Sequence, residues 1–479
     1  MKLENFIRGF DFSRRRGALY TYDLDIKKIV TVPEKADINS IYVAVKTPLG
    51  DGFHGAAAAY SRGCRVFVSA RVLDLPPNAA EFYTASPEIA VSILAAKCYG
   101  ACLKGLTVLG VTGTHGKTSV VESLAALLRK CGRRVATLST DGITSSKRFL
   151  PHEGNAPCVT DVWEFLQRAH GDKAEFAILE FSSYMLAQKA HLSIPFAALL
   201  LTDYAPCHVG TVHESEAAYR AAKQALFNTN APLSLLPYDC DAITASRRVV
   251  RYGRAGEILL KEAIPVGRDG VSITLSLNGE EIRFFYPMVG DFAYKNALAV
   301  AAMAFAVGLS PAEIAAGMPA ALPKGRLECL FADDGKRIYL DAAYEGEALA
   351  RVLKALRGVT EGRLSVLFGA VGGRAVARRV PLGEAAFNHA DFVWLTADDP
   401  DAEPPEKIAE EIVGVYFNSA AYRICPSREK AIAMAVDDLQ PGDTLLILGK
   451  PREDTQLIHG QKKRFSDRLK VQSALKKQQ

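Results

Sequence analysis

Short apolar runs alternate along the chain with longer stretches in which apolar residues recur every three or four positions. The short runs are typical of strands buried on both faces, and the longer stretches are typical of helices that pack on a sheet. This alternation predicts parallel sheets covered by helices, which is an α/β fold. Because 479 residues are too many for one hydrophobic core, we expect three α/β domains, at residues 1–105, 106–325 and 326–479.

In the first domain, apolar runs predict strands at residues 41–45 and 65–68, with a helix at 56–62 between them. The polar turn at residues 51–54 is expected to cap that helix. A second helix, which begins at Pro87, is expected to connect this small domain to the next one.

The two larger domains repeat the alternation over more elements. In the central domain we expect strands at residues 106–110, 134–138, 176–180 and 196–202, a hairpin of 272–277 and 283–286 around Asn278-Gly279, and a helix at 296–307. After a linker at 323–326 we expect strands at 337–341, 364–368, 391–396 and 444–448, and helices at 348–356, 406–415 and 427–439. In such sheets, ligands bind at the C-terminal ends of the strands.

The stretch Gly110-Val-Thr-Gly-Thr-His-Gly-Lys-Thr118 joins the first central strand to a helical pattern. A glycine loop between strand and helix is typical of a phosphate-binding loop, because its amides and the helix N-terminus face the anion. The strict pattern has glycine where Val111 stands, so this loop is a close variant. We expect Lys117 to reach the phosphates and Thr118 to bind magnesium. The alternative is a glycine turn with a chance Lys-Thr pair.

Four other residues are candidates for chemistry. Glu180 ends the strand at 176–180 and Asp203 follows the strand at 196–202, so both are expected on the same rim as the phosphate loop. A carboxylate at Glu180 needs a partner, which is either a magnesium ion or a strand-end cap. By themselves, His208 and Lys223 are an ordinary loop histidine and a solvated helix lysine.

Composition adds little to this picture. A net charge of +5 gives no case for nucleic acid binding, although it suits an anionic substrate. The nine cysteines form no Cys-x-x-Cys pair, which indicates reduced thiols and a cytoplasmic location rather than disulfides or zinc. No apolar run approaches the roughly 18 residues of a membrane span, so we expect no membrane insertion.

In chain order, these motifs resemble those of the Mur ligases, the ATP-dependent amino-acid-adding enzymes of peptidoglycan precursor synthesis, and most of all the MurE type. The resemblance covers essentially the whole chain. It is carried by residues 110–118, Glu180-Phe-Ser-Ser183, the loop around His208, Ala222-Lys-Gln-Ala-Leu-Phe227, Gly290-Asp-Phe-Ala-Tyr-Lys-Asn296, Gly325-Arg-Leu-Glu328 and Asp398-Asp-Pro-Asp401. It implies a UDP-binding N-terminal domain, a central ATP-binding domain, a Rossmann-like C-terminal domain that binds the amino acid, and a monomer.

The resemblance also implies roles for particular residues. The ATP-binding residues would be Gly113, Thr114, His115, Gly116, Lys117, Thr118, Ser119, Asn296, Arg326 and Asp341. The magnesium ligands would be Thr118, Glu180, His208 and a carbamylated Lys223, and the catalytic residues would be Lys117, Glu180, His208 and Lys223. A carbamate is an anion, whereas an ammonium would repel the metal ions. The γ-phosphoryl group would pass to a substrate carboxylate, and an amine would attack the resulting acyl phosphate.

The implied acceptor is UDP-N-acetylmuramoyl-L-alanyl-D-glutamate. Its contacts would be Asp51, His54, Thr160, Ser183 and Gln188. Ala190 stands where the family usually has arginine, so Lys189 or His191 is expected to supply the missing charge. Gly325 and Arg326 are candidate hinge residues for closure of the C-terminal domain.

The amino acid would contact Arg374, Asp398, Asp399, Asp401 and Glu453. Relatives that add meso-diaminopimelate carry D-N-P-R where this chain has Asp398-Asp-Pro-Asp401. Replacing arginine by aspartate exchanges an anion receptor for a cation receptor. The prediction is therefore L-lysine, with L-ornithine as the second choice. Diaminopimelate stays a candidate because Arg452 could bind its second carboxylate. The alternative is that the acidic turn is merely solvated and binds no amino acid.

Some positions depart from the family pattern. Asp203 replaces a common asparagine, Cys207 replaces an aspartate and Tyr344 replaces a histidine. A divergent paralogue that uses another acceptor is therefore a further alternative. A folylpolyglutamate synthase-like ligase is the second candidate within the class, and it would not need the first domain. A non-catalytic ATP-binding switch protein is the candidate from a different class.

Overall fold

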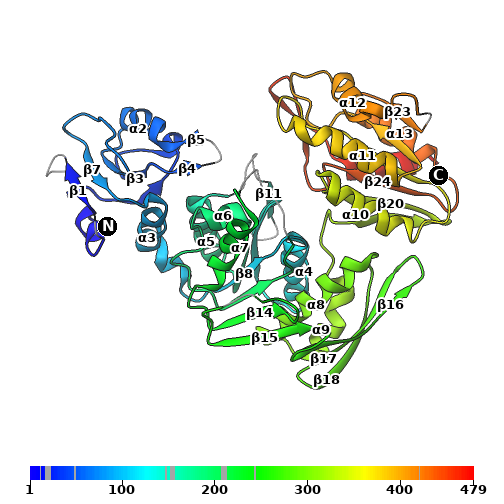
Figure 1. Ribbon diagram of the computed structural model, residues 1–479, viewed down its shortest axis with the longest axis horizontal. Helices are drawn as coiled ribbons and strands as arrows, with labels where there is room; N and C mark the ends of the chain where they lie inside the picture. The colour runs from blue at the N-terminus through cyan, green and yellow to red at the C-terminus, as the bar shows by residue number, and fades with distance from the viewer. Residues whose placement is uncertain are drawn as a thin grey trace. The chain divides into compact units, whose positions relative to one another are not determined.

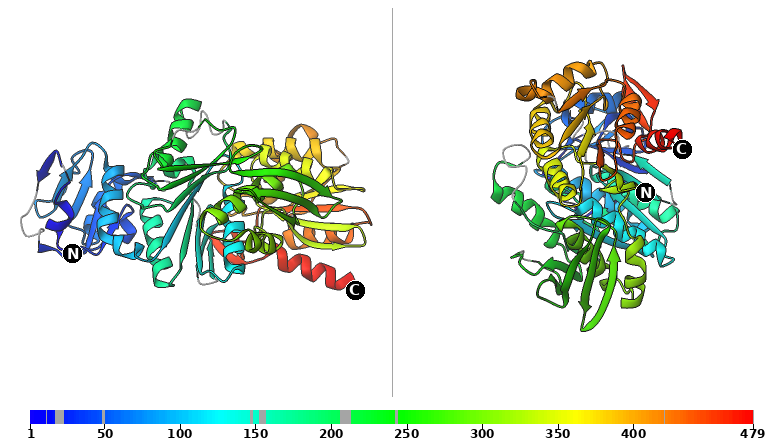
Figure 2. Two further views of the ribbon diagram at one scale, coloured as in Figure 1. Left: turned by 90° about the horizontal axis from the view of Figure 1, so that it is seen from below. Right: turned by 90° about the vertical axis from the view of Figure 1, so that its right-hand side faces the viewer.

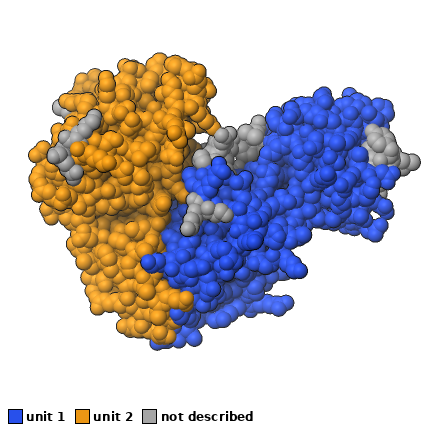
Figure 3. All heavy atoms as spheres, turned by 180° about the vertical axis from the view of Figure 1, so that it is seen from behind, with its two compact units in different colours: residues 1–259, 277–279, 299–310 blue, residues 260–276, 280–298, 311–479 orange. Residues whose placement is uncertain are grey.

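The structure, a computed structural model, describes residues 1–10, 12–16, 23–47, 50–145, 148–151, 157–205, 213–241, 244–419 and 421–478. The chain separates into two compact units, which Figure 3 colours differently. Unit 1 comprises residues 1–259, 277–279 and 299–310, and unit 2 comprises 260–276, 280–298 and 311–479. Within the described ranges, no helix combines the length and the apolar content that crossing a membrane requires.

Unit 1 begins with a five-stranded sheet, drawn in blue in Figure 1. Its order is β1 (Arg14–Arg16), β7 (Ala80–Tyr83), β6 (Val66–Ser69), β3 (Ser40–Val43) and β2 (Lys28–Val30), and only β1 runs antiparallel to its neighbour. Helix α2 (Gly52–Ser61) lies between β3 and β6 in the chain. Helix α3 (Pro87–Tyr99) packs against this sheet and also against helix α5 (Val159–Gly171). It is therefore the connector that the sequence predicts.

The second sheet positions the candidate phosphate site. Its parallel part has the order β9 (Val135–Ser139), β12 (Phe176–Glu180), β8 (Thr107–Thr112), β13 (Ala198–Leu201), β14 (Leu233–Pro237) and β15 (Arg248–Gly253). Strands β10 (Gly142–Ser145) and β11 (Arg148–Pro151) add an antiparallel edge. Because β8 lies between β12 and β13, the C-terminal ends of these three strands meet at one edge.

Both faces of this sheet are buried, as its apolar strands predict. Val108 and Leu179 belong to a core shared with α3 and α5, whereas the alternate residues Leu109 and Ile178 are equally buried but lie outside that core. Helix α4 (Lys117–Lys130) contacts β8, β9 and β12. Short helices α6 (Ser183–Ala187) and α7 (Glu216–Phe227) follow β12 and β13 in the chain.

Strand β16 (Ile258–Val266) leaves unit 1, and the sheet order continues through β17 (Gly270–Leu277) and β18 (Glu280–Tyr286), followed by α8 (Asp291–Ala306) and α9 (Pro311–Gly317). The third sheet has the order β19 (Glu328–Asp333), β20 (Lys336–Asp341), β24 (Thr444–Leu448), β21 (Leu364–Phe368), β22 (Phe392–Leu395) and β23 (Tyr422–Ile424). All its pairs are parallel except β19–β20.

The helices of this last part are α10 (Gly346–Arg357), α11 (Arg379–His389), α12 (Pro405–Val413), α13 (Arg428–Asp437) and the C-terminal α14 (Asp467–Gln478), which is red in Figure 2. A separate hairpin, β25 (Thr455–Ile458) and β26 (Gln461–Arg464), precedes α14.

The predicted α/β fold with parallel sheets is confirmed, and each expected strand is present within three residues of its predicted ends. The helix expected at residues 56–62 begins earlier, at Gly52, because Asp51 caps it: Asp51 Oδ1 accepts from the amide of Phe53 at 3.0 Å. The domain boundaries at residues 105/106 and 325/326 stay predictions.

A buried ion pair holds two strand ends of unit 2 together. The Arg428 guanidinium contacts both carboxylate oxygens of Asp467, at 2.7 and 2.6 Å, and both side chains are inaccessible to solvent. Arg428 also donates to the carbonyls of Ala397 and Leu448, which follow or end β22 and β24. Those two strand ends lead into the turns that carry the predicted amino-acid-binding residues.

Removing one partner of this pair leaves an uncompensated buried charge. We expect Arg428→Leu to lower the free energy of unfolding by about 3–5 kcal/mol. The measurement is urea unfolding followed by fluorescence, with Arg464→Leu on the exposed strand β26 as the matched control, for which we expect about 0.5 kcal/mol or less. Equal effects of the two substitutions would contradict the role given to the pair.

Candidate active site

The phosphate loop leaves β8 after Thr112 and enters α4 at Lys117, as predicted. Gly116 caps the helix in the left-handed region, with φ of 76°. Lys117 Nζ donates to the carbonyl of Thr114 at 3.0 Å, which closes the loop on itself. The first amides of α4, from Lys117 to Ser119, have no preceding helical turn to bond with, so they can bind an anion.

Two residues that follow β13, Thr202 and Asp203, form hydrogen bonds with the loop. Asp203 Oδ1 accepts from the amides of Thr114 and His115, both at 2.8 Å, and Asp203 Oδ2 lies 2.8 Å from His115 Nδ1. Thr202 Oγ1 donates to the carbonyl of His115 at 2.6 Å. Burial raises the pKa of Asp203, but the hydrogen bonds from His115 outweigh it and leave this pKa below its ordinary value. Asp203 is therefore a carboxylate at neutral pH, and its predicted place on the rim is confirmed.

Glu180 lies on the other side of the loop, at the end of β12. It is 3% exposed. Its Oε2 accepts from Thr118 Oγ1 at 2.8 Å and from the amide of Thr140 at 3.0 Å, and its Oε1 accepts from Thr140 Oγ1 at 2.6 Å. The structure thus brings Thr118 and Glu180 together, as a shared magnesium ion would require. Thr140 follows β9, the strand beside β12, so strand order would have identified it.

Lys223 is buried, not solvated. It lies on α7, is 3% exposed, and its Nζ donates to the carbonyl of Gly113 in the phosphate loop. Its ammonium also lies 4.7 Å from the ring centroid of Tyr219, whose hydroxyl is 3.0 Å from Thr114 Oγ1. The alternative of an ordinary surface lysine is therefore wrong. His208 lies outside the described residues, so its predicted role stays a prediction.

The described residues fit one magnesium ion better than two. Magnesium prefers oxygen ligands, which the Thr118 hydroxyl and the Glu180 carboxylate supply side by side. The Lys223 side chain would be a ligand only after carbamylation, because an ammonium has no lone pair to offer. In the parts of the chain that the structure describes, no three or more His, Cys, Asp and Glu side chains form a ready-made metal site.

Gly113 makes a specific test of the loop possible. Its φ is +152°, and a Cβ atom there would lie 1.8 Å from Thr202 Oγ1. Since the loop would have to move, we expect Gly113→Ala to weaken ATP binding at least tenfold, the equivalent of about 1.4 kcal/mol. Calorimetry measures this directly. Gly171→Ala, where nothing lies within 4 Å, is the matched control, and an equal effect of both would contradict the account.

The other predicted substrate residues of unit 1 occupy helix starts and ends. Asp51 caps α2 and lies 3.7 Å from Arg71, and His54 is an exposed residue of its first turn. Thr160 is the second residue of α5, with its hydroxyl 3.1 Å from Cys158 Sγ. Ser183 begins α6 and Gln188 ends it. Their proposed contacts with the acceptor stay predictions.

His191 cannot supply the charge that Ala190 lacks. It is 2% exposed, and its buried Nδ1 has no hydrogen-bond partner among the described residues. Burial, together with the nearby Lys189, lowers the pKa of His191 to about 4, so the ring is neutral at pH 7. The expectation for His191 is therefore wrong, and Lys189 remains the candidate for supplying this charge.

The same burial predicts a pH-dependent stability. His191 takes up a proton in the unfolded chain below about pH 6.5 but in the folded chain only near pH 4, so stability is lost as the pH falls through this window. We expect the His191→Leu variant to lack a slope of about 1.4 kcal/mol per pH unit that the parent protein shows in urea unfolding. The exposed His170→Leu should keep it, and identical slopes for all three proteins would contradict the assignment.

Two of the predicted nucleotide-binding residues, Asn296 and Asp341, lie in unit 2. Asn296 is a buried residue of α8. Asp341 ends β20, and its carboxylate accepts from the amides of Leu327 and Ala343, both at 2.7 Å. These bonds fix the chain just after Arg326. Gly325, a predicted hinge residue, has φ of +70°, and its position is packed against Pro451.

The acidic turn at residues 398–401 is neither free nor merely solvated. Lys450 Nζ, on a side chain that is 1% exposed, lies 2.8 Å from Asp399, 3.7 Å from Asp398 and 2.5 Å from Glu453. Burial lowers the pKa of Lys450, but the three carboxylates outweigh it and raise this pKa overall. Two of the three aspartates counted as receptors for a substrate cation therefore already have a cation. The carboxylate of Asp401 instead accepts from the amide of Gly460 at 2.6 Å.

The loop that carries Arg374 is tied to this turn. The amide of Gly372 donates to the carbonyl of Asp399, and the amide of Gly373 donates to Glu403, each at 2.9 Å. Arg379 in turn binds both carboxylate oxygens of Glu403, at 3.0 and 2.7 Å. The Arg379 guanidinium and the Gly373 amide hold the pKa of Glu403 at about 2. Arg374 itself is exposed.

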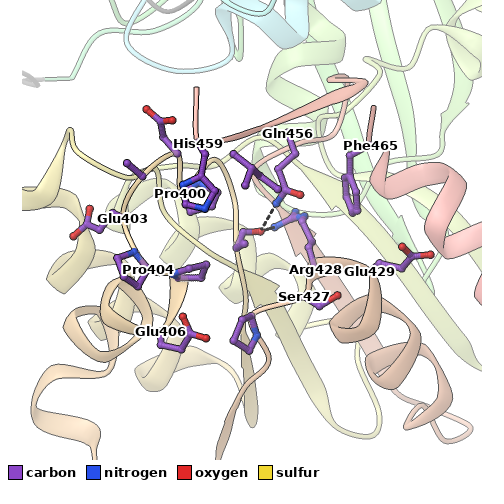
Figure 4. Close-up of a pocket in the computed structure, with 16 residues that line it drawn as sticks. Pro400, Glu403, Pro404, Glu406, Ser427, Arg428, Glu429, Gln456, His459 and Phe465 are labelled. Carbon is purple, nitrogen blue, oxygen red and sulfur yellow. Dashed lines mark hydrogen bonds between the residues drawn. The ribbon is translucent and has the colours of Figure 1, made fainter. Parts of the chain in front are cut away.

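A cavity of about 470 Å³ opens beside the acidic turn (Figure 4). Asp401 lines it, whereas Arg374, Asp398, Asp399 and Glu453 are not among its lining residues. The dashed lines of Figure 4 mark donation by Gln456 and Arg428 to the carbonyl of Ala397. Asp401 thus lines this cavity of unit 2, whereas the carboxylates that contact Lys450 do not.

Comparison with known proteins defines the class. The profile of the Mur ligase middle domain matches residues 111–304, and that of the Mur ligase, glutamate ligase domain matches residues 325–451. A UDP-N-acetylmuramoyl-L-alanyl-D-glutamate--2,6-diaminopimelate ligase from Bradyrhizobium diazoefficiens is 31% identical, over 89% of this chain and 92% of the relative. The chain belongs to the Mur ligase family, as its motifs predict.

Within that family, the similarity to the 2,6-diaminopimelate ligases extends over nearly the whole length. The protein of that name from Geobacter metallireducens is 28% identical, over 99% of this chain and 98% of the relative. A solved structure of such a ligase has a TM-score of 0.68 at 22% identity, over 100% of this chain and 99% of that one. MurF from Thermotoga maritima, solved in complex with ADP, has a TM-score of 0.56 at 18% identity, over 95% and 98%.

Proposed function

We propose that the chain is an ATP-dependent ligase that adds the third amino acid of the stem peptide to UDP-N-acetylmuramoyl-L-alanyl-D-glutamate. The observation that carries the proposal is the assembly of Thr118, Glu180 and Lys223 around one phosphate loop, in a chain of this family. The full-length similarity to relatives named for this acceptor supports it. Magnesium and a cytoplasmic location are parts of the same proposal.

The residues suit a phosphoryl transfer that is followed by amide formation. The amides at the start of α4 and the Lys117 ammonium bind the triphosphate. Thr118 and Glu180 would hold magnesium, which offsets the negative charge of the phosphates when bound. The γ-phosphoryl group passes to the acceptor carboxylate, forming an acyl phosphate and releasing ADP. The amino group of the incoming amino acid then attacks the carbonyl carbon, an amide bond forms, and inorganic phosphate leaves.

We propose L-lysine as the amino acid, and the charge argument for it now rests on Asp401. The single charge of Lys450 is already shared by Asp398, Asp399 and Glu453, whereas no ion pair to Asp401 is found among the described residues, and its Oδ1 accepts from a backbone amide. A carboxylate at this position attracts an ammonium and repels the second carboxylate of diaminopimelate. L-Ornithine is the close alternative. Diaminopimelate is the second candidate because the curated relatives carry it in their names.

Both the ligase activity and the choice of amino acid are tested by offering amino acids in turn with ATP and the muramoyl dipeptide. The measurements are phosphate release and product mass. We expect turnover with lysine. Asp401→Asn keeps the oxygen that accepts from Gly460 but removes the charge, so we expect about a tenfold loss in kcat/KM for lysine. Glu410→Gln, at an exposed position of α12, is the matched control.

The outcomes separate the alternatives. Turnover with diaminopimelate but not with lysine would support the assignment as a ligase and contradict the assignment of lysine as its amino acid. Turnover only with another carboxylate acceptor would favour the folylpolyglutamate synthase-like or paralogous ligase. Nucleotide binding without turnover on any acceptor would favour the switch protein.

A further inference from the structure

Thr140 gives Glu180 two hydrogen bonds that the proposed mechanism does not use. Its amide donates to Glu180 Oε2 at 3.0 Å, and its hydroxyl donates to Glu180 Oε1 at 2.6 Å. We propose that Thr140 is a positioning residue that restricts Glu180 to binding magnesium through one oxygen, Oε1, and thereby favours magnesium over calcium. The inference rests on the magnesium site of the proposed function, and not on the identity of the acceptor or the amino acid.

The bonds of Glu180 leave one of its oxygens less occupied than the other. A carboxylate has about four lone-pair positions, shared equally by its oxygens. Oε2 accepts from the Thr118 hydroxyl at 2.8 Å as well as from the Thr140 amide, so both of its positions are used. Among the described residues, Oε1 accepts only from the Thr140 hydroxyl, so it keeps a position for a metal ion.

The two donors of Thr140 also fix the orientation of the carboxylate. They contact different oxygens, so turning the carboxylate plane breaks at least one of the bonds. Glu180 is 3% exposed, so water does not readily replace a lost donor, and leaving a bond to a buried charged group unmade is costly. The Thr118 hydroxyl gives its proton to Oε2 and keeps its oxygen lone pairs for the same ion.

Binding through one oxygen suits magnesium better than calcium. Magnesium requires nearly ideal octahedral geometry, and the two oxygens of one carboxylate are too close together to occupy two ideal octahedral positions. Calcium takes about six to eight oxygens in flexible geometry and accepts a carboxylate through one oxygen or both. A carboxylate that is fixed with one oxygen open therefore favours the smaller ion. Without the Thr140 hydroxyl, both oxygens of Glu180 can turn toward one ion.

Binding of ATP with magnesium or calcium, without acceptor or amino acid, tests the inference separately from the ligase assignment. By calorimetry, we expect Thr140→Val to weaken binding with magnesium about tenfold, because a hydrogen bond to a charged group is lost. With calcium the loss should be less than about threefold. Thr140→Ser keeps the hydroxyl and should bind as the parent protein does. Thr229→Val is the matched control, since its hydroxyl donates to the carbonyl of Leu226 and not to a carboxylate.

Infrared spectra give a second readout that a general structural effect would not change. The separation of the two carboxylate stretching bands differs between one-oxygen and two-oxygen binding of a metal ion. The bands of Glu180, identified by their loss in Glu180→Gln, should show one-oxygen binding of magnesium in the parent protein.

Four outcomes would overturn the inference. They are a loss with calcium as large as that with magnesium, no loss with magnesium, a Thr140→Ser variant that binds no better than Thr140→Val, and two-oxygen binding of magnesium in the parent protein.

Discussion

The order β12-β8-β13 in the second sheet is the constraint on which the candidate site depends. Three parallel strands that end at one edge bring Glu180, the phosphate loop and Asp203 into contact, although 62 residues separate Thr118 from Glu180 and 89 separate Thr114 from Asp203. The side chains at the neighbouring strand ends then bond to the loop. The loop is therefore held in shape by the neighbouring strand ends as well as by its own bond from Lys117 to Thr114. Only glycine fits at position 113, because Thr202 occupies the adjacent space.

Buried charges organise both units in the same way. Lys223 bonds to a loop carbonyl in unit 1, while Lys450 and Arg428 bind carboxylates in unit 2. An unpaired buried charge is costly, so each of these side chains fixes the loops that supply its partners. A consequence is that the formal charge of a motif is a poor guide to the charge that a ligand meets. The acidic turn at residues 398–401 contains three aspartates, but two of them have Lys450 as an internal counter-ion.

The parallel strands and the phosphate loop could be predicted because a strand buried on both faces requires a continuous apolar run, as at residues 176–180 and 444–448. Exposed or edge strands such as β16 and β26 give no such signal, and they were not predicted. Helix α5 was missed although its apolar residues have helical spacing. Contacts between distant residues could not be predicted: no local pattern shows that Lys223 is buried, that Lys450 contacts two aspartates of the turn, or that His191 is neutral.

The proposed amino-acid specificity rests on one side chain, Asp401. Its φ of 50° lies in the left-handed region, which aspartate tolerates better than most residues. Its carboxylate accepts from the amide of Gly460, which lies between strands β25 and β26. Asp401 lines a cavity, unlike the three carboxylates that contact Lys450. Lysine and diaminopimelate differ by one carboxylate at the far end of the side chain. In the proposed amino-acid site, the charge at position 401 would act on the one group in which the two amino acids differ.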